Sequence, residues 1–240
     1  MQDESGTGAS KEWWDDPRMP WKGKPGRADL LCWAGFSLSG VIGLVMIPLR
    51  PILIGTLPLL LVALTGSRSG LVTIGALGDV GQAPWWWIGL IVGIVSAMKW
   101  DPLFWWAGRL WGKGLIGVIS GRSRWAAFNA ARAERLARRW AIPAVLLTWL
   151  PFVPAAIVYA TVGMAGMRLR TFLIVDLIGS TLICSLWMFL GFQLGQSAVD
   201  VVELIAKYSG YISIGLIVII IANAYIQSRR RPAPPVKVED

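Results

Sequence analysis

The sequence predicts an all-α polytopic membrane protein, and three observations support this fold class. The 240 residues are 55% hydrophobic and 15% charged, with a mean hydropathy of +0.57. Several apolar runs approach the ~20 residues that a helix needs to cross a bilayer. Several of the 15 tryptophans lie near the ends of those runs, as expected for side chains at a membrane interface. The net charge is +9, and the lysines and arginines lie largely beside the apolar runs. This placement indicates that they orient the protein in the membrane rather than bind nucleic acid.

The chain begins with a polar tail, residues 1–28, whose acidic and basic side chains roughly cancel. A membrane domain is predicted over residues 29–227. Its first apolar run, 30–49, is expected to end at Pro48-Leu49-Arg50-Pro51, because internal prolines interrupt helices. A shorter run, 52–64, follows at once. Because a polar tail precedes the first run, no cleavable signal peptide is expected.

The next span opens at the tryptophan triplet 85–87 and continues to about Met98. Asp101 followed by Pro102 has the pattern of a helix N-cap with proline in the first turn. A helix is therefore expected to restart there. Basic and aromatic residues between 99 and 111 indicate a cytoplasmic interface.

Residues 121–141 predict an amphipathic helix on the cytoplasmic surface. On a helical wheel, one arc is apolar and the other is basic, as in helices that lie in a membrane interface. The apolar arc contains Trp125, Phe128, Ala133, Leu136 and Trp140. The sequence leaves two roles open: a helix that binds anionic lipid, or a solvated connector that only sets the topology.

An apolar stretch, residues 141–166, is interrupted by Pro151 and Pro154. One straight helix is not expected there, since each proline removes a hydrogen bond and clashes with the preceding turn. In hydrocarbon, non-helical backbone is stable only where protein buries it or where it lines a wet cavity. The pattern therefore favours a re-entrant hairpin at a binding site over a kinked spanning helix.

A long span follows from Thr171 to about Gly195, and it contains Asp176. An acid inside a span is by default a functional hypothesis, because burying its charge is costly. The alternative is an interfacial acid paired with Arg168 or Arg170. A polar link at 196–207 and a last helix at 208–227 lead to a basic, proline-rich tail at 228–240, which predicts a cytoplasmic C-terminus in the plasma membrane.

Two sets of motifs resemble those of a known family. In the first half, Asp101 is followed after six residues by Gly108-Arg109 and then by Gly112. In the second half, residues 148–154 align with the pattern Arg-Phe-x-Pro-x-x-Arg, and further matches follow at Gly163, Met167, Phe172, Gly179, Gly191 and Gly195. Asp176 stands where the family usually has asparagine. Over residues 45–196 the chain thus resembles the DedA family of bacterial membrane proteins, which have the VTT or SNARE-associated domain.

The resemblance implies two inverted repeats, each a re-entrant hairpin followed by a spanning helix. They would occupy 29–120 and 142–196, joined by the connector. It also implies a lipid flippase that moves a polyprenyl phosphate or a phospholipid, coupled to protons. The spacing Pro48-x-x-Pro51 mirrors Pro151-x-x-Pro154, and Gly108-x-x-x-Gly112 mirrors Gly191-x-x-x-Gly195.

The chain departs from the family where its charges are expected. Thr148 and Pro154 replace the two arginines of the pattern, and the first hairpin lacks the family's acid. The predicted substrate-binding residues are Arg50, Arg109, Thr148, Pro151 and Pro154. The predicted proton-coupling residues are Asp101 and Asp176. Arg50 has a second interpretation as an interfacial arginine that reaches lipid headgroups, and Asp101 has a second interpretation as a simple N-cap.

The lost charges also favour an alternative function, a non-transporting accessory or scaffold subunit of a larger membrane complex. The expected partners are membrane lipids, with a protein partner or a second copy of the chain as further options. An enzyme is not expected, since the chain has no histidine and no recognisable nucleophile with a base. Cys32 and Cys184 lie in separate apolar runs, so no metal or other cofactor is predicted.

Overall fold

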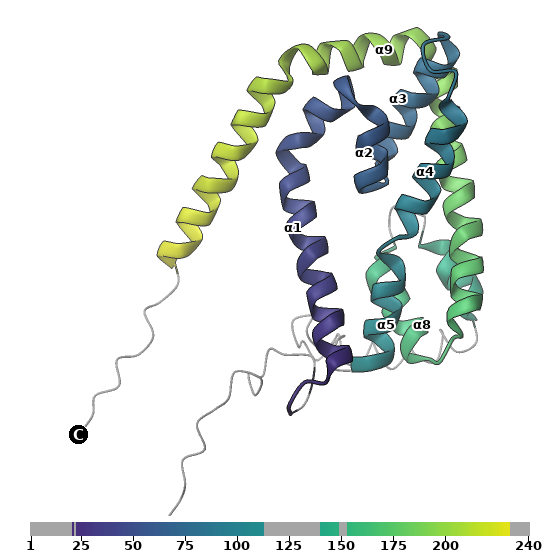
Figure 1. Cartoon of the computed structure of the whole chain (residues 1–240), viewed down its shortest axis with the longest axis vertical. Coiled ribbons are helices and arrows are strands. Elements are labelled where there is room, and N and C mark those ends of the chain that lie inside the picture. Colours follow the sequence, from purple (N-terminus) through teal and green to yellow (C-terminus); the bar gives the residue numbers. More distant parts are fainter. Residues whose placement is uncertain (1–20, 22, 113–139, 149–152, 231–240) are drawn as a thin grey trace, which may run out of the picture. The chain divides into compact units, whose positions relative to one another are not determined.

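The computed structural model describes residues 21, 23–112, 140–148 and 153–230. Apart from residues 140 and 141, the predicted amphipathic connector lies outside these ranges, as does Pro151. The described residues form helices and no strand (Figure 1). The helices are α1 (Arg27–Thr56), α2 (Pro58–Thr65), α3 (Arg68–Asp79), α4 (Trp86–Met98), α5 (Asp101–Trp111), α8 (Ala155–Met164) and α9 (Leu169–Arg230). Residues 140–147 are also helical.

Three helical stretches are long and apolar enough to cross a bilayer. They are Arg27–Thr56, Trp86–Trp111 and Leu169–Asn223. Many of their large apolar side chains are exposed, such as Val95 and Leu182, at 65% and 66%. In water such a surface would be unfavourable, whereas lipid tails can cover it. Length and composition thus agree with the predicted class, an all-α membrane protein.

Helix α1 does not end at Pro48-Leu49-Arg50-Pro51, as the sequence pattern predicted, but continues to Thr56. Prolines are tolerated in apolar helices when neighbouring groups satisfy the backbone. Pro48 and Pro51 leave the carbonyls of Leu44 and Ile47 without a helical donor. Ser213 Oγ donates at 2.6 Å to a different carbonyl, that of Pro48, which is a tertiary contact beside the prolines. The break comes at Leu57, whose φ of −138° and ψ of 64° are not helical. Pro58 explains this position, because proline disfavours the helical region for the residue before it.

Helix α9 also continues where the sequence predicted a polar link. Residues 196–207 are helical, and the non-helical backbone within α9 is at Gly195, with φ 47° and ψ −127° (Figure 1). The link contains no proline. Gln196 Nε2 donates to Asp200 Oδ1 at 2.8 Å, a side-chain pair four residues apart that supports a helix. The helix is thus interrupted at Gly195, where the sequence placed the end of the span, whereas the polar residues 196–207 are helical and do not form a link.

The chain divides into two compact units, each made of two chain segments. Unit 1 comprises Met1–Gly40 and Ala97–Ile183, and unit 2 comprises Val41–Ser96 and Cys184–Asp240. Unit 1 thus contains α5 and α8 with the first parts of α1 and α9. Unit 2 contains α2, α3 and α4 with the later parts of α1 and α9.

In unit 1, α5 and α8 meet at backbone contact. A Cβ added to Gly108 would overlap the carbonyl oxygen of Ala160, and one added to Gly163 would overlap that of Trp105. Only glycine allows such an approach. The aromatic rings of Trp105 and Tyr159 then pack on Phe172, with centroids 6.4 Å and 5.1 Å from its ring.

Unit 2 repeats this contact between α3 and α9. A Cβ on Gly75 would overlap the Met188 carbonyl oxygen, and one on Gly191 would overlap that of Val72. In both units each glycine faces the carbonyl three residues before its partner glycine.

Four residues after Gly108 and Gly191 stand two further glycines, Gly112 and Gly195, whose backbone dihedral angles also match. Gly112 has φ 48° and ψ −121°, close to the values of Gly195. Side chains rarely adopt this positive φ, so glycine is required there too.

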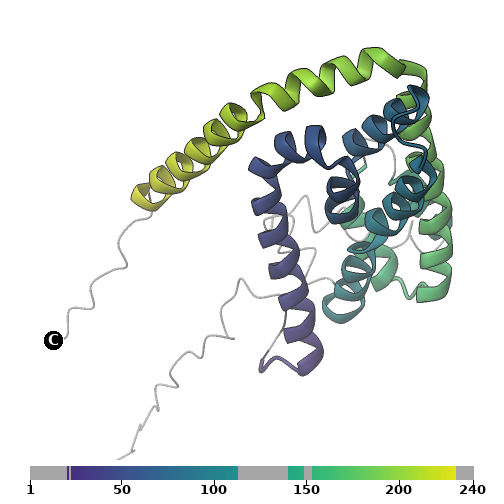
Figure 2. The ribbon, with the colours of Figure 1, turned by 45° about the horizontal axis from the view of Figure 1, so that its top comes forward.

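Helices α2 and α3 lie side by side in both views of the ribbon (Figure 1, Figure 2). They have 8 and 12 residues, about 12 and 18 Å of helix, and neither can cross a hydrocarbon core of about 30 Å. Gly66 ends α2 in the left-handed conformation, and Ser67 Oγ accepts a hydrogen bond from the Gly70 amide at the start of α3. These two caps produce the tight turn.

Candidate functional site

Asp101 is the first residue of α5 and not its N-cap, so that interpretation of the sequence was wrong. The N-cap is Trp100, and no side chain makes the capping hydrogen bond. The helix does restart at Asp101, as predicted. The Asp101 carboxyl instead lies close to Asp176 and Tyr159.

Asp176 is fully buried in α9, at 0% exposure. Tyr159 of α8 donates its hydroxyl proton to Asp176 Oδ1 at 3.1 Å, and Oδ2 has no hydrogen-bond partner among the described residues. Arg168 and Arg170 are exposed. The pairing of Asp176 with either arginine, which the sequence left open, is therefore not found in the described part of the chain.

A chain of hydrogen-bond contacts extends from Asp176 to the helix at residues 140–147. Beyond Tyr159, the next contact joins the tyrosine hydroxyl to Thr148 Oγ1 at 3.0 Å. Thr148 Oγ1 also contacts the Val145 carbonyl oxygen at 2.6 Å. All four residues are buried. Because Val145 is 0% exposed and Thr148 only 6%, water does not compete for these contacts.

Four separate segments thus bring ionisable or hydroxyl groups to one buried place in unit 1. They are the start of α5, the end of the helix at 140–147, the middle of α8 and the first turns of α9. Two carboxylates at this place would repel each other, and the fully buried Asp176 is not hydrated as it would be in water, whereas Asp101 is partly exposed. A proton shared between Asp101 and Asp176 removes that repulsion. The arrangement can therefore hold and release a proton.

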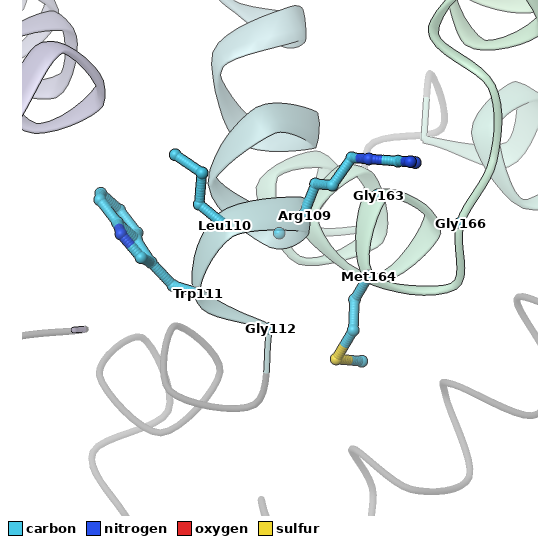
Figure 3. A pocket seen from close by; sticks show the side chains of 8 residues that line it. Arg109, Leu110, Trp111, Gly112, Gly163, Met164 and Gly166 are labelled. Atoms are coloured by element: carbon cyan, nitrogen blue, oxygen red, sulfur yellow. The ribbon is translucent and has the colours of Figure 1, made fainter. Parts of the chain in front are cut away.

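A cavity of about 450 Å³ lies at the C-terminal ends of α5 and α8. Arg109 reaches from α5 toward the C-terminal end of α8 near Gly163, whereas Trp111 points to the other side (Figure 3). The guanidinium carbon lies 5.6 Å from the centre of the Trp105 ring, a cation–π contact that orients it. The cavity is lined by Gly108, Arg109, Leu110, Trp111, Gly112, Gly163, Met164 and Gly166.

The cavity and the acid pair are two sites at opposite ends of one helix. Asp101 and Arg109 are eight residues apart, which is about 12 Å along α5. A charged group bound at Arg109 and a proton held at Asp101 would therefore not contact each other directly. One route between them runs through side chains, from Arg109 to Trp105, Phe172 and Tyr159.

The remaining predicted site residues lie elsewhere. Arg50 is exposed, within the continuous helix α1 and in unit 2. Pro154 is the N-cap of α8, in extended backbone with no capping hydrogen bond from its side chain. Pro151 is outside the described residues. Among the predicted residues, Asp101, Asp176 and Thr148 are brought together through Tyr159, and Arg109 lines the cavity.

Sequence reasoning missed Tyr159, the residue that connects the others. Its signal is faint, because a tyrosine in an apolar helix is usually an ordinary core residue. What distinguishes Tyr159 is a buried hydroxyl with two polar contacts, and only the fold reveals these. In the described residues, no group of three His, Cys, Asp or Glu side chains could hold a metal ion.

Fold and site together define a helical protein of the membrane class, with a pair of acids of which Asp176 is fully buried and a separate cavity lined by Arg109. No protein-family profile, curated protein or solved structure matches the chain.

Proposed function

We propose that this chain is a divergent DedA-type transporter. It moves an anionic lipid, a polyprenyl phosphate or a phospholipid, across the plasma membrane and couples this to proton movement. The observation that carries the proposal is the fully buried Asp176, with Asp101 close to it, in a helix that is long and apolar enough to cross a bilayer. Ionisable groups are costly there and typically belong to proton or substrate pathways.

The two glycine-paired helix contacts support the inverted repeats that the resemblance implies. The same backbone approach, followed by the same positive-φ glycine, occurs once in each unit. The short helices α2 and α3 support a re-entrant hairpin in the first repeat, because neither is long enough to span. In this proposal that hairpin replaces the one first assigned to the prolines of α1.

Arg109 is the proposed headgroup ligand. A phosphate cannot enter hydrocarbon unpaired, and a guanidinium binds phosphate oxygens through two parallel hydrogen bonds. The cavity at Arg109 has room for such a group. Arg50 remains a second candidate, either at the substrate path or at the interface with lipid headgroups.

Transport in reconstituted vesicles tests this assignment. We expect Arg109→Ala to abolish the movement of a labelled anionic phospholipid, and Arg109→Lys to retain part of it, since the charge survives without the bidentate geometry. The matched control is Arg170→Ala, which removes an exposed arginine outside the cavity lining. Equal transport by Arg109→Ala and the parent would exclude Arg109 as the headgroup ligand.

One observation favours the second function, a non-transporting subunit of a membrane complex. Thr148 occupies the position of a family arginine, and its hydroxyl is engaged with Tyr159 and Val145 rather than free for a ligand. On this hypothesis the parent protein transports no lipid and co-purifies with a protein partner at fixed stoichiometry. A bound lipid without such a partner would support the transporter instead.

A further inference from the structure

Three polar contacts link Asp176 to the Val145 carbonyl, and the hydroxyl groups between them cannot supply a proton to each contact when Asp176 is ionised. The contacts join Asp176 to Tyr159, Tyr159 to Thr148, and Thr148 to Val145, at 3.1, 3.0 and 2.6 Å. The two hydroxyls supply two protons, and a carbonyl supplies none. With Asp176 ionised at Oδ1, three contacts therefore share two protons. One contact has to lack a proton.

With Asp176 ionised, Tyr159 donates to the carboxylate, because a bond to a charged acceptor is stronger than one to a neutral oxygen. Thr148 then has one proton for two acceptors, Tyr159 and Val145. When Asp176 Oδ1 carries a proton, the whole chain is satisfied in one direction. Asp176 donates to Tyr159, Tyr159 to Thr148, and Thr148 to the Val145 carbonyl.

The Val145 carbonyl is at the end of the helix at residues 140–147, where backbone groups lack helical partners. It accepts a bond from the Thr148 amide at 3.2 Å as well as from the Thr148 hydroxyl. Among the described residues, loss of the hydroxyl bond leaves the Val145 carbonyl with only the longer of these two bonds. The stability of this helix end therefore depends on where the Thr148 proton points.

We propose that Tyr159 and Thr148 are positioning residues that transmit the protonation state of the acid pair to the end of the helix at 140–147. The titratable groups facing Asp176 are Asp101 of α5 and Tyr159 of α8. A proton between the two carboxyls occupies the unpartnered Oδ2. A second proton, at Oδ1, reverses the direction of the hydrogen-bond chain and secures the helix end. This inference deepens the proposed proton coupling and rests on it for its biological role.

Hydrogen exchange of the full-length protein in detergent tests the inference without any transport measurement. The readout is the exchange rate of the peptide that contains residues 140–148, corrected for the intrinsic dependence of exchange on pH. We expect exchange to be slower at low pH than at high pH, by roughly 2- to 10-fold, the effect of one hydrogen bond. A corrected rate that does not change with pH in the parent protein would overturn the inference.

Variants separate this relay from a merely structural role. Tyr159→Phe and Thr148→Val should both remove the pH dependence, and Thr148→Ser should restore it. Asp176→Asn should give slow exchange at every pH, because its amide always donates to Tyr159. Tyr211→Phe, at a side chain that is 79% exposed, is the matched control and should behave as the parent. A pH transition that persists in Tyr159→Phe would contradict the proposed relay.

The outcomes also distinguish this inference from the proposed function. A parent protein that shows the exchange transition but moves no lipid would refute transport and leave the relay intact. A parent that moves lipid in response to pH but shows no transition would refute the relay alone.

Discussion

The helix contact of α5 with α8 and that of α3 with α9 use the same backbone geometry but different side chains. Four residues before the glycine of the shorter helix stands Tyr159 in unit 1 and Leu71 in unit 2. Seven residues before the glycine of the longer helix stands Asp101 in unit 1 and Cys184 in unit 2. The two units thus share the helix contact, but only unit 1 has a tyrosine and a carboxylic acid at these positions.

The residue of unit 2 that corresponds to Asp176 is Gly93, which is not ionisable. The same offset of 83 residues relates Gly93 to Asp176 and Gly108 to Gly191. In unit 2, Leu71 packs on Gly93, and a Cβ there would be 2.8 Å from a Leu71 methyl carbon. A tyrosine and an acid in unit 1 therefore correspond to a leucine and a glycine in unit 2. Because unit 2 makes the same contact without them, the acids are not needed to pack the helices.

The largest expected effect concerns the shared scaffold. Gly108→Ala and Gly191→Ala should each destabilise the protein by about 3 kcal/mol, since the added methyl group meets backbone that cannot move aside locally. Unfolding in mixed micelles would measure both. Gly43→Ala is the control, because nothing lies within 4 Å of its added Cβ. A large cost at one crossing but not at the other would break the equivalence of the two units.

A smaller effect is expected when an acid is placed in unit 2. Cys184 is 3% exposed and has no tyrosine counterpart to donate to it, although the charge of Arg68 acts on this position. Cys184→Asp should cost about 2 kcal/mol, because Arg68 offsets only part of the cost of burying a carboxyl. Cys184→Asn, of the same shape without the charge, isolates the electrostatic part. If both variants unfold like the parent, unit 2 tolerates a polar or ionisable side chain at this buried position without loss of stability.

The smallest expected effect comes from making unit 1 as apolar as unit 2. Tyr159→Phe leaves the buried Asp176 without its donor and should cost about 1–2 kcal/mol. Adding Asp176→Leu should recover part of this loss, since removal of both polar partners is less costly than removal of one. The same unfolding measurement applies. Strictly additive losses would show that Tyr159 and Asp176 do not stabilise each other.

Much of the helical architecture could be predicted from local rules. Apolar runs located the spans, and Asp101-Pro102 correctly marked the start of α5. The prediction was wrong at Pro48 and Pro51, which stay within α1. A tertiary contact is also made there, from the distant Ser213 side chain to the Pro48 carbonyl. No pattern within residues 30–64 reports that contact.

The candidate site was only partly visible in the sequence for a similar reason. Acids inside apolar runs are conspicuous, so Asp176 was identified as a candidate and Asp101 was weighed against a cap. Their partner Tyr159 is not conspicuous, since its role depends on four segments that meet only in the fold. Thr148 drew attention as a lost arginine, whereas its described role is a hydrogen bond to Tyr159.

The central claim is that one of two matched units carries a proton-coupled lipid pathway. Vesicles with purified protein, a labelled anionic phospholipid and an imposed pH gradient test it most directly. We predict that the gradient accelerates lipid movement by the parent, and that Asp176→Asn, which cannot release a proton, moves lipid at a rate independent of the gradient. A gradient response in Asp176→Asn equal to that of the parent, or no lipid movement by the parent at all, would contradict the account.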